Sequence, residues 1–211
     1  MRGLFVTLEG GEGAGKTTQA RALYEELRAE GRDVVSTREP GGVPLAEAVR
    51  AVILDATLGP TDPMTELFLY AACRAEHRSA VIVPALERGA IVICDRYSDA
   101  TVAYQGFGRG LPIPVVREVC RFSEQGVRPD LTLLVDVPPA VGIARARRRG
   151  ETTRFEDEAM AFHERVREGY LAQSREEPWR FAVIDGTAPE PDVLAALLAA
   201  LRARLARRES R

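Results

Sequence analysis

The chain has 211 residues, 45% of them apolar, and a formal net charge of -2, which suits one α/β domain that needs neither disulfides nor metal for its core. This charge excludes a strong attraction to nucleic acid or to anionic membranes, and no apolar run is long enough for a signal peptide or a membrane span. Three dispersed cysteines, Cys73, Cys94 and Cys120, predict reduced thiols of a cytoplasmic protein, and His77 and His163 are interpreted as structural because their spacing forms no metal site.

Strands and helices alternate along the whole sequence. Five short runs rich in β-branched and large apolar residues predict strands buried on both faces, as in a parallel sheet: Leu4–Leu8, Asp33–Thr37, Ala90–Cys94, Leu131–Val135 and Phe181–Ile184. Apolar residues at helical spacing fill the gaps, in the series Leu45, Val49, Ile53, then Phe155, Ala159, Phe162, Val166, and then Leu194, Leu197, Leu201, Leu205. The pattern predicts a doubly wound α/β fold with a five-stranded parallel sheet, and we assign residues 1–211 to a single domain.

A glycine-rich loop follows the first predicted strand. The residues Gly10, Gly11, Glu12, Gly13, Ala14, Gly15, Lys16 and Thr17 fit G-x-x-x-x-G-K-[ST] and open a helix, which is the context that a phosphate-binding loop requires. Its backbone N–H groups and the helix dipole favour phosphate, and we expect these residues and Thr18 to bind ATP. Lys16 is the single lysine among 29 Lys and Arg residues, which indicates that this position needs a compact ammonium.

Two carboxylates lie close to this loop. Because an acidic group is repelled by phosphate unless a cation intervenes, Glu9 at the end of the strand is predicted to meet Mg²⁺ or its waters, and the hydroxyl of Thr17 is predicted to bind Mg²⁺. Glu12 lies inside the loop, and two like charges 4 Å apart cost about 1 kcal/mol even in water. We therefore expect Glu12 to point away from the donor phosphates toward a second substrate, although a solvated loop carboxylate remains an alternative.

The ends of the third and second predicted strands carry further charged residues. Asp95 is placed to hold Mg²⁺ through water, and Arg96 beside it can grip an acceptor phosphate with two N–H groups. An Asp-Arg pair after a strand is weak evidence by itself. Arg38, in Thr37–Gly42, adds an arginine at the same edge of the sheet.

Two other segments suggest how a second nucleotide is held. Tyr70 and Arg74 are i, i+4 neighbours on the predicted helix 66–77, so a ring and a guanidinium share one face and can contact a base. The alternative is a buried tyrosine beside a surface arginine. Four arginines in Val141–Gly150 predict a lid, about 141–156, whose charge assists phosphoryl transfer; the alternative is a solvated basic helix face.

Six segments, in order, give the sequence a specific resemblance: LEGGEGAGKTTQ, TREPGG, ELFLYAACRAEH, DRYSDATVAYQGFGRG, PDLTLLVDV and RARRRGETTRFE. Together they resemble bacterial thymidylate kinases, a family of P-loop nucleoside-monophosphate kinases. The resemblance implies transfer of the γ-phosphoryl group of ATP to dTMP, with Mg²⁺, in a homodimer. It also implies substrate-binding roles for Glu12, Arg38, Tyr70, Arg74, Arg96, Thr101, Tyr104 and Gln105.

The resemblance further implies that the catalytic arginine lies in the lid, because the phosphate loop contains no arginine. The candidates are Arg149 and Arg154, which join Lys16, Arg96, Glu9 and Asp95 as the expected catalytic set. The segment Asp185–Ala188 corresponds to the loop beside the donor adenine. Two positions depart from the family pattern: Thr153 precedes Arg154 where an aspartate is frequent, and Ala100 replaces a frequent serine.

Two rival functions stay open at this point. One is another small P-loop kinase that acts on a different nucleotide or on a nucleoside. The other is a nucleotide-driven switch such as a GTPase, but the guanine-reading pattern N-K-x-D needs a second lysine, and the chain has none.

Overall fold

Five strands form the central sheet of the computed structural model, which describes residues 2–148, 155 and 158–209. The strands are β1 (Leu4–Glu9), β2 (Val34–Arg38), β3 (Ile91–Asp95), β4 (Leu131–Asp136) and β5 (Phe181–Asp185). All neighbouring strands pair in parallel, in the order β2-β3-β1-β4-β5. The predicted fold class is confirmed, and each predicted strand lies within one residue of the observed bounds.

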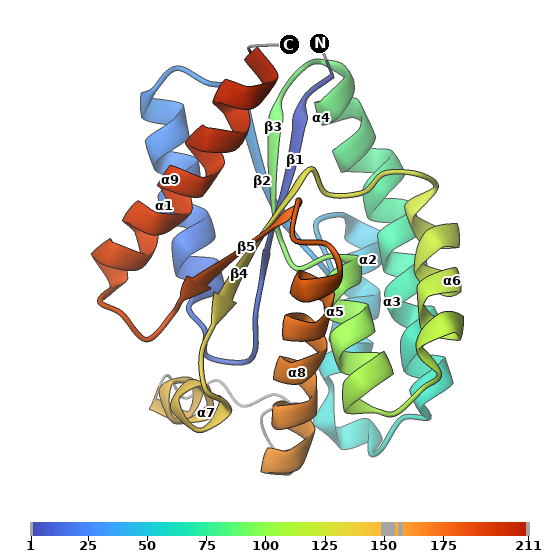
Figure 1. Cartoon of the computed structure of the whole chain (residues 1–211). Coiled ribbons are helices and arrows are strands. Elements are labelled where there is room, and N and C mark those ends of the chain that lie inside the picture. Colours follow the sequence, from blue (N-terminus) through green and yellow to red (C-terminus); the bar gives the residue numbers. More distant parts are fainter. Residues whose placement is uncertain (1, 149–154, 156–157, 210–211) are drawn as a thin grey trace.

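Helices cover both faces of this sheet (Figure 1). Helices α1 (Lys16–Ala29) and α9 (Glu190–Glu209) pack together on one face. The other face carries α2 (Pro44–Leu54), α3 (Pro63–His77), α4 (Val83–Glu87), α5 (Ser98–Thr101), α6 (Ile113–Glu124) and α8 (Met160–Glu176). Short turns complete the chain: the 3₁₀ turn η1 (Ala56–Leu58) and the π-helical segments η2 (Arg78–Ile82) and η3 (Val102–Gly108).

Side chains of β1 alternate between two separate cores. Leu4, Val6 and Leu8 pack in the cluster that includes residues of α1 and α9, whereas Phe5 points to the opposite cluster and meets Tyr97 edge-on. Each fully buried leucine or valine contributes about 1.5–3 kcal/mol. This two-sided burial makes the strand a rigid support for the loop that follows it.

The carboxyl ends of three strands bring charged residues to one edge of the sheet. In the parallel register Asp95 lies beside Leu8 on one side and beside Arg38 on the other. In doubly wound sheets such an edge forms the ligand-binding crevice. The fold therefore gathers the residues that follow β1, β2 and β3 around the phosphate loop.

Two helical expectations differ from the structure. In α2 the first residue of the predicted apolar series, Leu45, is 60% exposed, and its neighbour Ala46 is fully buried instead. Helix α8 begins at Met160, so Phe155 lies in a turn outside it. The buried ring of Phe155 meets Tyr104 edge-on. Phe155 is therefore apolar because of this tertiary contact, and not because it belongs to helix α8.

The arginine-rich segment begins with a helix. Helix α7 (Pro139–Arg148) ends in Arg145, Arg147 and Arg148, and the last two are exposed. The rest of the predicted lid, with Arg149 and Arg154, lies outside the described residues, apart from Phe155. Within the described ranges, no helix combines the length and apolarity needed to cross a lipid bilayer.

Candidate functional site

The phosphate loop connects β1 directly to α1. Gly10, Gly13 and Gly15 have positive φ angles of 145°, 67° and 87°, which side chains rarely adopt, so glycine permits the tight path of the loop. At its end Lys16 is 7% exposed, and its Nζ donates to the carbonyl of Gly11 at 2.8 Å. Burial and the nearby charge of Arg96 lower the pKa of Lys16 to about 8. Bound phosphate, being anionic, favours the charged ammonium in this place.

A hydroxyl and a carboxylate meet beside the loop. Thr17 Oγ1 donates to Asp95 Oδ2 at 2.7 Å, and both residues line an open cavity. Within the described part of the chain, no cluster of three or more His, Cys, Asp or Glu side chains could hold a metal ion. Mg²⁺ commonly uses one or two protein oxygens plus waters and substrate phosphates. The donor set of Thr17 and Asp95 therefore fits Mg²⁺ bound mainly through a nucleotide.

Glu9 occupies a different environment from the one predicted. Its carboxylate is fully buried, and its oxygens accept hydrogen bonds from the backbone N–H of Tyr97 at 2.8 Å and the hydroxyl of Tyr170 at 2.9 Å. Burial, reinforced by the charge of Asp99, raises the pKa of Glu9 to about 8. The burial of this carboxylate and its two hydrogen bonds indicate a structural role under the loop, and the contact of Glu9 with Mg²⁺ or its waters stays a prediction.

Arg96 reaches over the phosphate loop because of its backbone. Its φ angle of 70° is uncommon for a residue with a side chain and costs about 1–3 kcal/mol. The guanidinium donates to Glu12 Oε1 at 2.8 Å, to the carbonyl of Gly10 at 3.2 Å and to Tyr170 Oη at 3.2 Å. It also lies 4.8 Å from the centre of the Tyr104 ring. This strained turn fixes a cation beside the loop.

Glu12 lines a cavity beside the phosphate loop. Its Oε1 accepts hydrogen bonds from the hydroxyl of Tyr104 at 2.7 Å and from Arg96. Burial alone would raise the pKa of Glu12, but the charges of Arg96 and Lys16 outweigh it and lower the pKa to about 2. Glu12 is therefore an anion at neutral pH. Its hydrogen bonds hold it against Tyr104 and Arg96, so the alternative of a carboxylate free in solvent is wrong.

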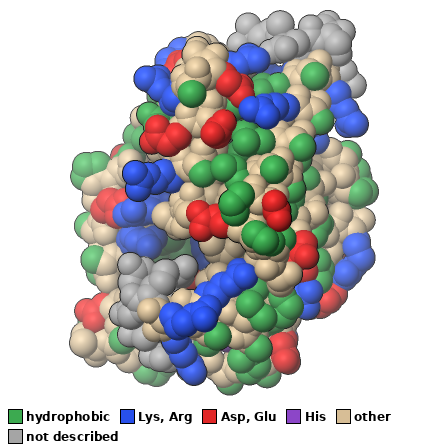
Figure 2. Space-filling view, turned by 90° about the vertical axis from the view of Figure 1, so that its left-hand side faces the viewer, with side chains coloured by type: hydrophobic (Ala, Val, Ile, Leu, Met, Phe, Trp, Pro, Cys, Tyr) green, Lys and Arg blue, Asp and Glu red, His purple; other side chains and the backbone are tan. Residues whose placement is uncertain are grey.

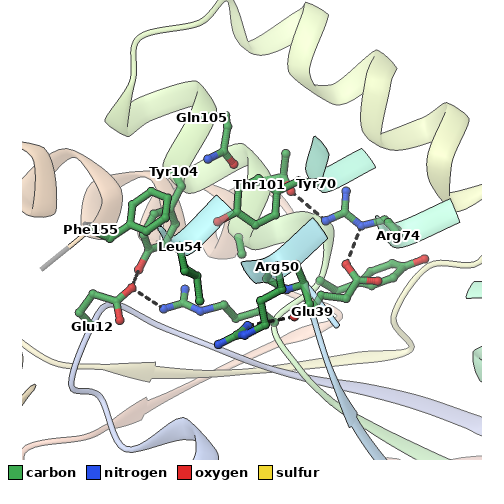
Figure 3. Close-up of a pocket in the computed structure, with 14 residues that line it drawn as sticks. Glu12, Glu39, Arg50, Leu54, Tyr70, Arg74, Thr101, Tyr104, Gln105 and Phe155 are labelled. Carbon is green, nitrogen blue, oxygen red and sulfur yellow. Dashed lines mark hydrogen bonds and ion pairs between the residues drawn. The ribbon is translucent and has the colours of Figure 1, made fainter. Parts of the chain in front are cut away.

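The cavity beside Glu12 has a volume of about 110 Å³ (Figure 3). It collects the predicted acceptor residues Tyr70, Arg74, Arg96, Thr101, Tyr104 and Gln105, which come from α3, α5, η3 and the end of β3. Arg74 is 1% exposed, so the alternative of a surface arginine is wrong. Tyr70 and Arg74 share this wall of the cavity, as their i, i+4 spacing predicted.

Other residues of this cavity were missing from the predicted set: Glu39, Pro40, Arg50, Leu54, Tyr97, Ala100 and Phe155. Arg50 and Leu54 are i, i+4 neighbours on α2, the same signal that identified Tyr70 and Arg74. Arg50 donates to the carbonyl of Pro40 at 2.9 Å and extends across the front of the cavity (Figure 3). With Arg74 and Arg96, it makes three guanidinium groups that line this cavity.

Two predicted acceptor residues have other partners. Arg38 is half exposed, pairs with Glu47 at 2.9 Å, and lines the cavity of Thr17 and Asp95 instead of the cavity of Tyr70. Gln105 lines the acceptor cavity, but its Nε2 donates to the buried Glu66 at 2.6 Å. Arg38 therefore lines a different cavity from the other predicted acceptor residues, and its contact with the acceptor phosphate stays a prediction.

A second cavity, of about 620 Å³, opens on the other side of the phosphate loop. Its walls are the loop, the start of α1, Arg145 and Arg148 of α7, and the segment Gly186–Glu190, including Ala188. Asp185 does not line it; its side chain instead accepts hydrogen bonds from the backbone N–H and hydroxyl of Thr187. Figure 2, which shows the side of the molecule bearing α1 and α9, has basic side chains gathered around a hollow.

The loop and α7 touch backbone to backbone. A Cβ on Gly13 would lie 1.8 Å from the carbonyl oxygen of Gly142, and a Cβ on Gly142 would lie 2.2 Å from that of Glu12. No side chain fits at either position. The phosphate loop and the first turn of α7 are therefore packed backbone against backbone at these two glycines.

Comparisons with known proteins agree with this geometry. The family model described as Thymidylate kinase matches residues 8–197. A thymidylate kinase of Geobacter sp. (strain M21) is 53% identical over 191 residues, 88% of this chain and 85% of that protein. One of Deinococcus radiodurans is 49% identical over 203 residues, 96% and 98% of the two chains. The crystal structure of thymidylate kinase from Ehrlichia chaffeensis superposes with a TM-score of 0.78 at 34% identity, covering 96% of this chain and 99% of that one.

Proposed function

The chain belongs to the thymidylate kinase family and phosphorylates dTMP to dTDP, and we propose that it takes the phosphoryl group from ATP across the phosphate loop. The observation that carries this proposal is the position of the two cavities. Glu12 lines one of them and the next residue, Gly13, lines the other. Two nucleotides bound in these cavities meet end to end above Lys16. Membership of this family excludes the nucleotide-switch alternative.

We propose that dTMP binds in the smaller cavity. The ring of Tyr70 offers a stacking surface for the base, and Arg74 and Thr101 offer hydrogen-bond partners for its polar edge. We expect the sugar to lie against Tyr104 and Glu12, which are joined by a hydrogen bond at the phosphate-loop end of the cavity. Gln105 lines the cavity next to Tyr104. Arg96 then meets the acceptor phosphate, because it is the cation that bridges the cavity and the loop.

We propose that ATP binds in the larger cavity, with its phosphates on the residues 10–18 and its adenine near Ala188. Lys16 neutralises the transferred group, and Thr17 and, directly or through water, Asp95 would hold Mg²⁺. Bound Mg²⁺ would neutralise phosphate charge that develops during the transfer. The transfer assay tests this arrangement, since chelation of Mg²⁺ should stop the reaction and added Mg²⁺ should restore it.

We further propose that residues 141–156 act as a lid that supplies a catalytic arginine. Arg145 and Arg148 already line the donor cavity, which supports a role of this segment near ATP. Arg149 and Arg154 stay predictions. We expect either Arg149→Ala or Arg154→Ala to lower kcat while the KM values for ATP and dTMP stay nearly unchanged. If both variants kept the kcat of the wild type, the proposal would be contradicted.

The preferred acceptor is tested by turnover with dTMP, dUMP, dCMP and dGMP. We expect the highest kcat/KM with dTMP and almost no consumption of ATP when the acceptor is omitted. Better use of another acceptor would favour the rival, a small P-loop kinase with a different nucleotide substrate.

Arg50 provides a test of the acceptor site that the family resemblance did not suggest. We expect Arg50→Ala to raise KM for dTMP about tenfold, ~1.4 kcal/mol of binding, because it removes a cation from the front of the cavity. The KM for ATP should stay within about twofold of the wild type. Arg38→Ala is the matched control, because Arg38 lies outside this cavity. If Arg38→Ala raised KM for dTMP more than Arg50→Ala did, the assignment of Arg50 to the dTMP site would be contradicted.

We propose a homodimer formed by the outer faces of α3 and α6. These helices pack side by side, and each exposes a large ring: Phe68 is 57% and Phe122 64% exposed. Apolar rings of this size on neighbouring helices are typical of an interface.

We expect Phe68→Asp and Phe122→Asp to shift the mass measured by light scattering from dimer toward monomer. The exposed Trp179, in the turn between α8 and β5, is the control; Trp179→Asp should leave the mass unchanged.

We also propose a cytoplasmic location. The three cysteines are buried as free thiols, which is the usual state in a reducing compartment. Cell fractionation checks this, and recovery of the protein in a secreted fraction would contradict it.

A further inference from the structure

A buried chain of polar side chains runs behind the base-binding wall. Thr37 Oγ1 lies 2.7 Å from His77 Nε2, and His77 Nδ1 lies 3.0 Å from Glu39 Oε1. The other oxygen of Glu39 accepts from Arg74 Nε at 2.9 Å, and Arg74 Nη2 donates to Thr101 Oγ1 at 2.8 Å. The chain therefore links the end of β2 to the cavity through α3 and α5.

The central three members of this chain are shielded from water. Glu39 is 4% exposed, Arg74 1% and His77 0%. Burial alone would lower the pKa of Arg74, but the charge of Glu39 outweighs it and raises the pKa. Removing one partner of such a buried charge pair leaves the other uncompensated, so the guanidinium would move or recruit another anion. Glu39 thus fixes where the N–H groups of Arg74 point.

The hydrogen bonds of the chain determine what the cavity presents to a base. Thr101 accepts from Arg74, so the hydroxyl hydrogen of Thr101 remains available to donate. Arg74 has five N–H groups and no acceptor. Two of these N–H groups hold Glu39 and Thr101, and another points toward the Sγ of Cys120 at 3.8 Å. This wall therefore offers hydrogen-bond donors to the base edge.

A cavity wall made of hydrogen-bond donors distinguishes pyrimidine bases by the group that they carry at C4. Thymine and uracil present a carbonyl oxygen at C4, whereas cytosine presents an amino group, which is itself a donor. An amino group facing N–H donors has no partner, and buried unpaired donors are strongly rejected. The methyl group that separates thymine from uracil plays no part in this contact.

We propose that His77 and Glu39 are positioning residues that make the cavity reject amino pyrimidines, acting through Arg74 and Thr101. His77 donates from Nδ1 to Glu39 and so holds the carboxylate in the orientation that Arg74 requires. This inference rests on the proposed function, because it presumes a pyrimidine monophosphate in the cavity of Tyr70 and Arg74.

A matched pair of variants at His77 tests the role of its two nitrogens separately. The amide nitrogen of asparagine lies near the place of Nδ1, so His77→Asn keeps the bond to Glu39. The amide nitrogen of glutamine lies near the place of Nε2, so His77→Gln keeps the bond to Thr37 and loses the bond to Glu39. We expect His77→Gln to lower the ratio of kcat/KM for dTMP to that for dCMP at least tenfold, mainly through KM for dTMP. His77→Asn should keep the ratio within about threefold.

The ratio of dTMP to dUMP separates positioning from simple loss of structure. Both bases carry the same carbonyl edge, so this ratio should stay constant while the ratio of dTMP to dCMP falls. Glu39→Gln should act in the same direction as His77→Gln. The control is Asp99→Asn, which removes a charge from the buried pair of Asp99 and Arg180, outside the residues that line the cavity. We expect it to lower the unfolding temperature and leave both ratios unchanged.

Distinct results overturn the inference and the proposed function. If wild-type protein fails to phosphorylate dTMP, the proposed function is wrong and this inference fails with it. If wild-type protein prefers dTMP and both His77→Gln and Glu39→Gln retain its ratio of dTMP to dCMP, only the inference is wrong. Equal losses for dTMP, dUMP and dCMP also overturn it, since they indicate a structural role alone. Should His77→Gln fail to fold, the ratio in Glu39→Gln decides.

Discussion

Lys16→Ala should lower kcat for phosphoryl transfer at least about a thousandfold, ~4 kcal/mol of transition-state stabilisation. The reason is geometric: the ammonium is buried in the phosphate loop, 2.8 Å from the carbonyl of Gly11, where it lies next to the site of the transferred group. Among the described residues, the nearest alternative in this cluster, Arg96, is held by Glu12, Gly10 and Tyr170. Single-turnover kinetics with saturating ATP and dTMP measures the effect.

Lys16→Arg provides the sharper version of this experiment. It keeps the charge but replaces a compact ammonium with a planar guanidinium, which does not fit the narrow loop. We expect activity close to that of Lys16→Ala and an unfolding temperature close to that of the wild type. If Lys16→Arg retained more than about a tenth of wild-type kcat, charge alone would suffice. The interpretation of the single lysine among 29 basic residues would then be wrong.

Arg96→Ala should lower kcat/KM for dTMP about a hundredfold, ~3 kcal/mol, while KM for ATP stays within about threefold. Arg96 is the described cation that reaches both the loop and the acceptor cavity, so its loss removes the contact with the acceptor phosphate. It also leaves Glu12 as an uncompensated anion in that place, which repels the phosphate. A loss smaller than about threefold in kcat/KM for dTMP would disprove this assignment.

Arg96→Gly separates the side chain from the backbone. With a φ angle of 70°, glycine adopts this conformation freely, whereas alanine keeps the strain. Both variants lose the guanidinium and should lose the same activity, but Arg96→Gly should be more stable than Arg96→Ala by about 1 kcal/mol in urea denaturation. Equal stability of the two variants would show that the strained turn carries no cost.

The strands and the phosphate loop were predictable from the sequence because both depend on local signals. A strand buried on both faces is a short apolar run, and the loop is a fixed spacing of glycine, lysine and threonine. The five strands and the start of α1 at Lys16 follow from these signals alone. The sequence assigned Thr17 and Asp95 separately to one magnesium site, and the two side chains lie 2.7 Å apart in the structure.

The acceptor cavity was less predictable because it depends on which helix faces meet. Arg50 and Arg38 are both arginines close to the end of β2, and no local pattern tells that α2 turns Arg50 into the cavity while Glu47 pairs with Arg38. The hydrogen bonds of Glu9 were not predictable for the same reason. Its position in the sequence is next to the loop, but the hydroxyl that binds it, on Tyr170, comes from a helix 161 residues further on.

His77 illustrates a third limit. An isolated histidine on a helix is most often structural, and the sequence contains no spacing that links it to Glu39 or Thr37. The pairing arises because the chain after β2 folds back against α3, so residues about 40 positions apart become neighbours. Buried polar chains of this kind are visible only once the tertiary fold is known.

The contact between Gly13 and Gly142 fixes the closest approach of the arginine-bearing helix to the phosphate loop. Because the two backbones touch without any intervening side chain, the first turn of α7 cannot come nearer to the loop. Arg145 and Arg148 follow Gly142 on the same helix, so this contact sets the distance at which their guanidinium groups line the larger cavity. A larger residue at either glycine would push the helix and its arginines outward from the loop.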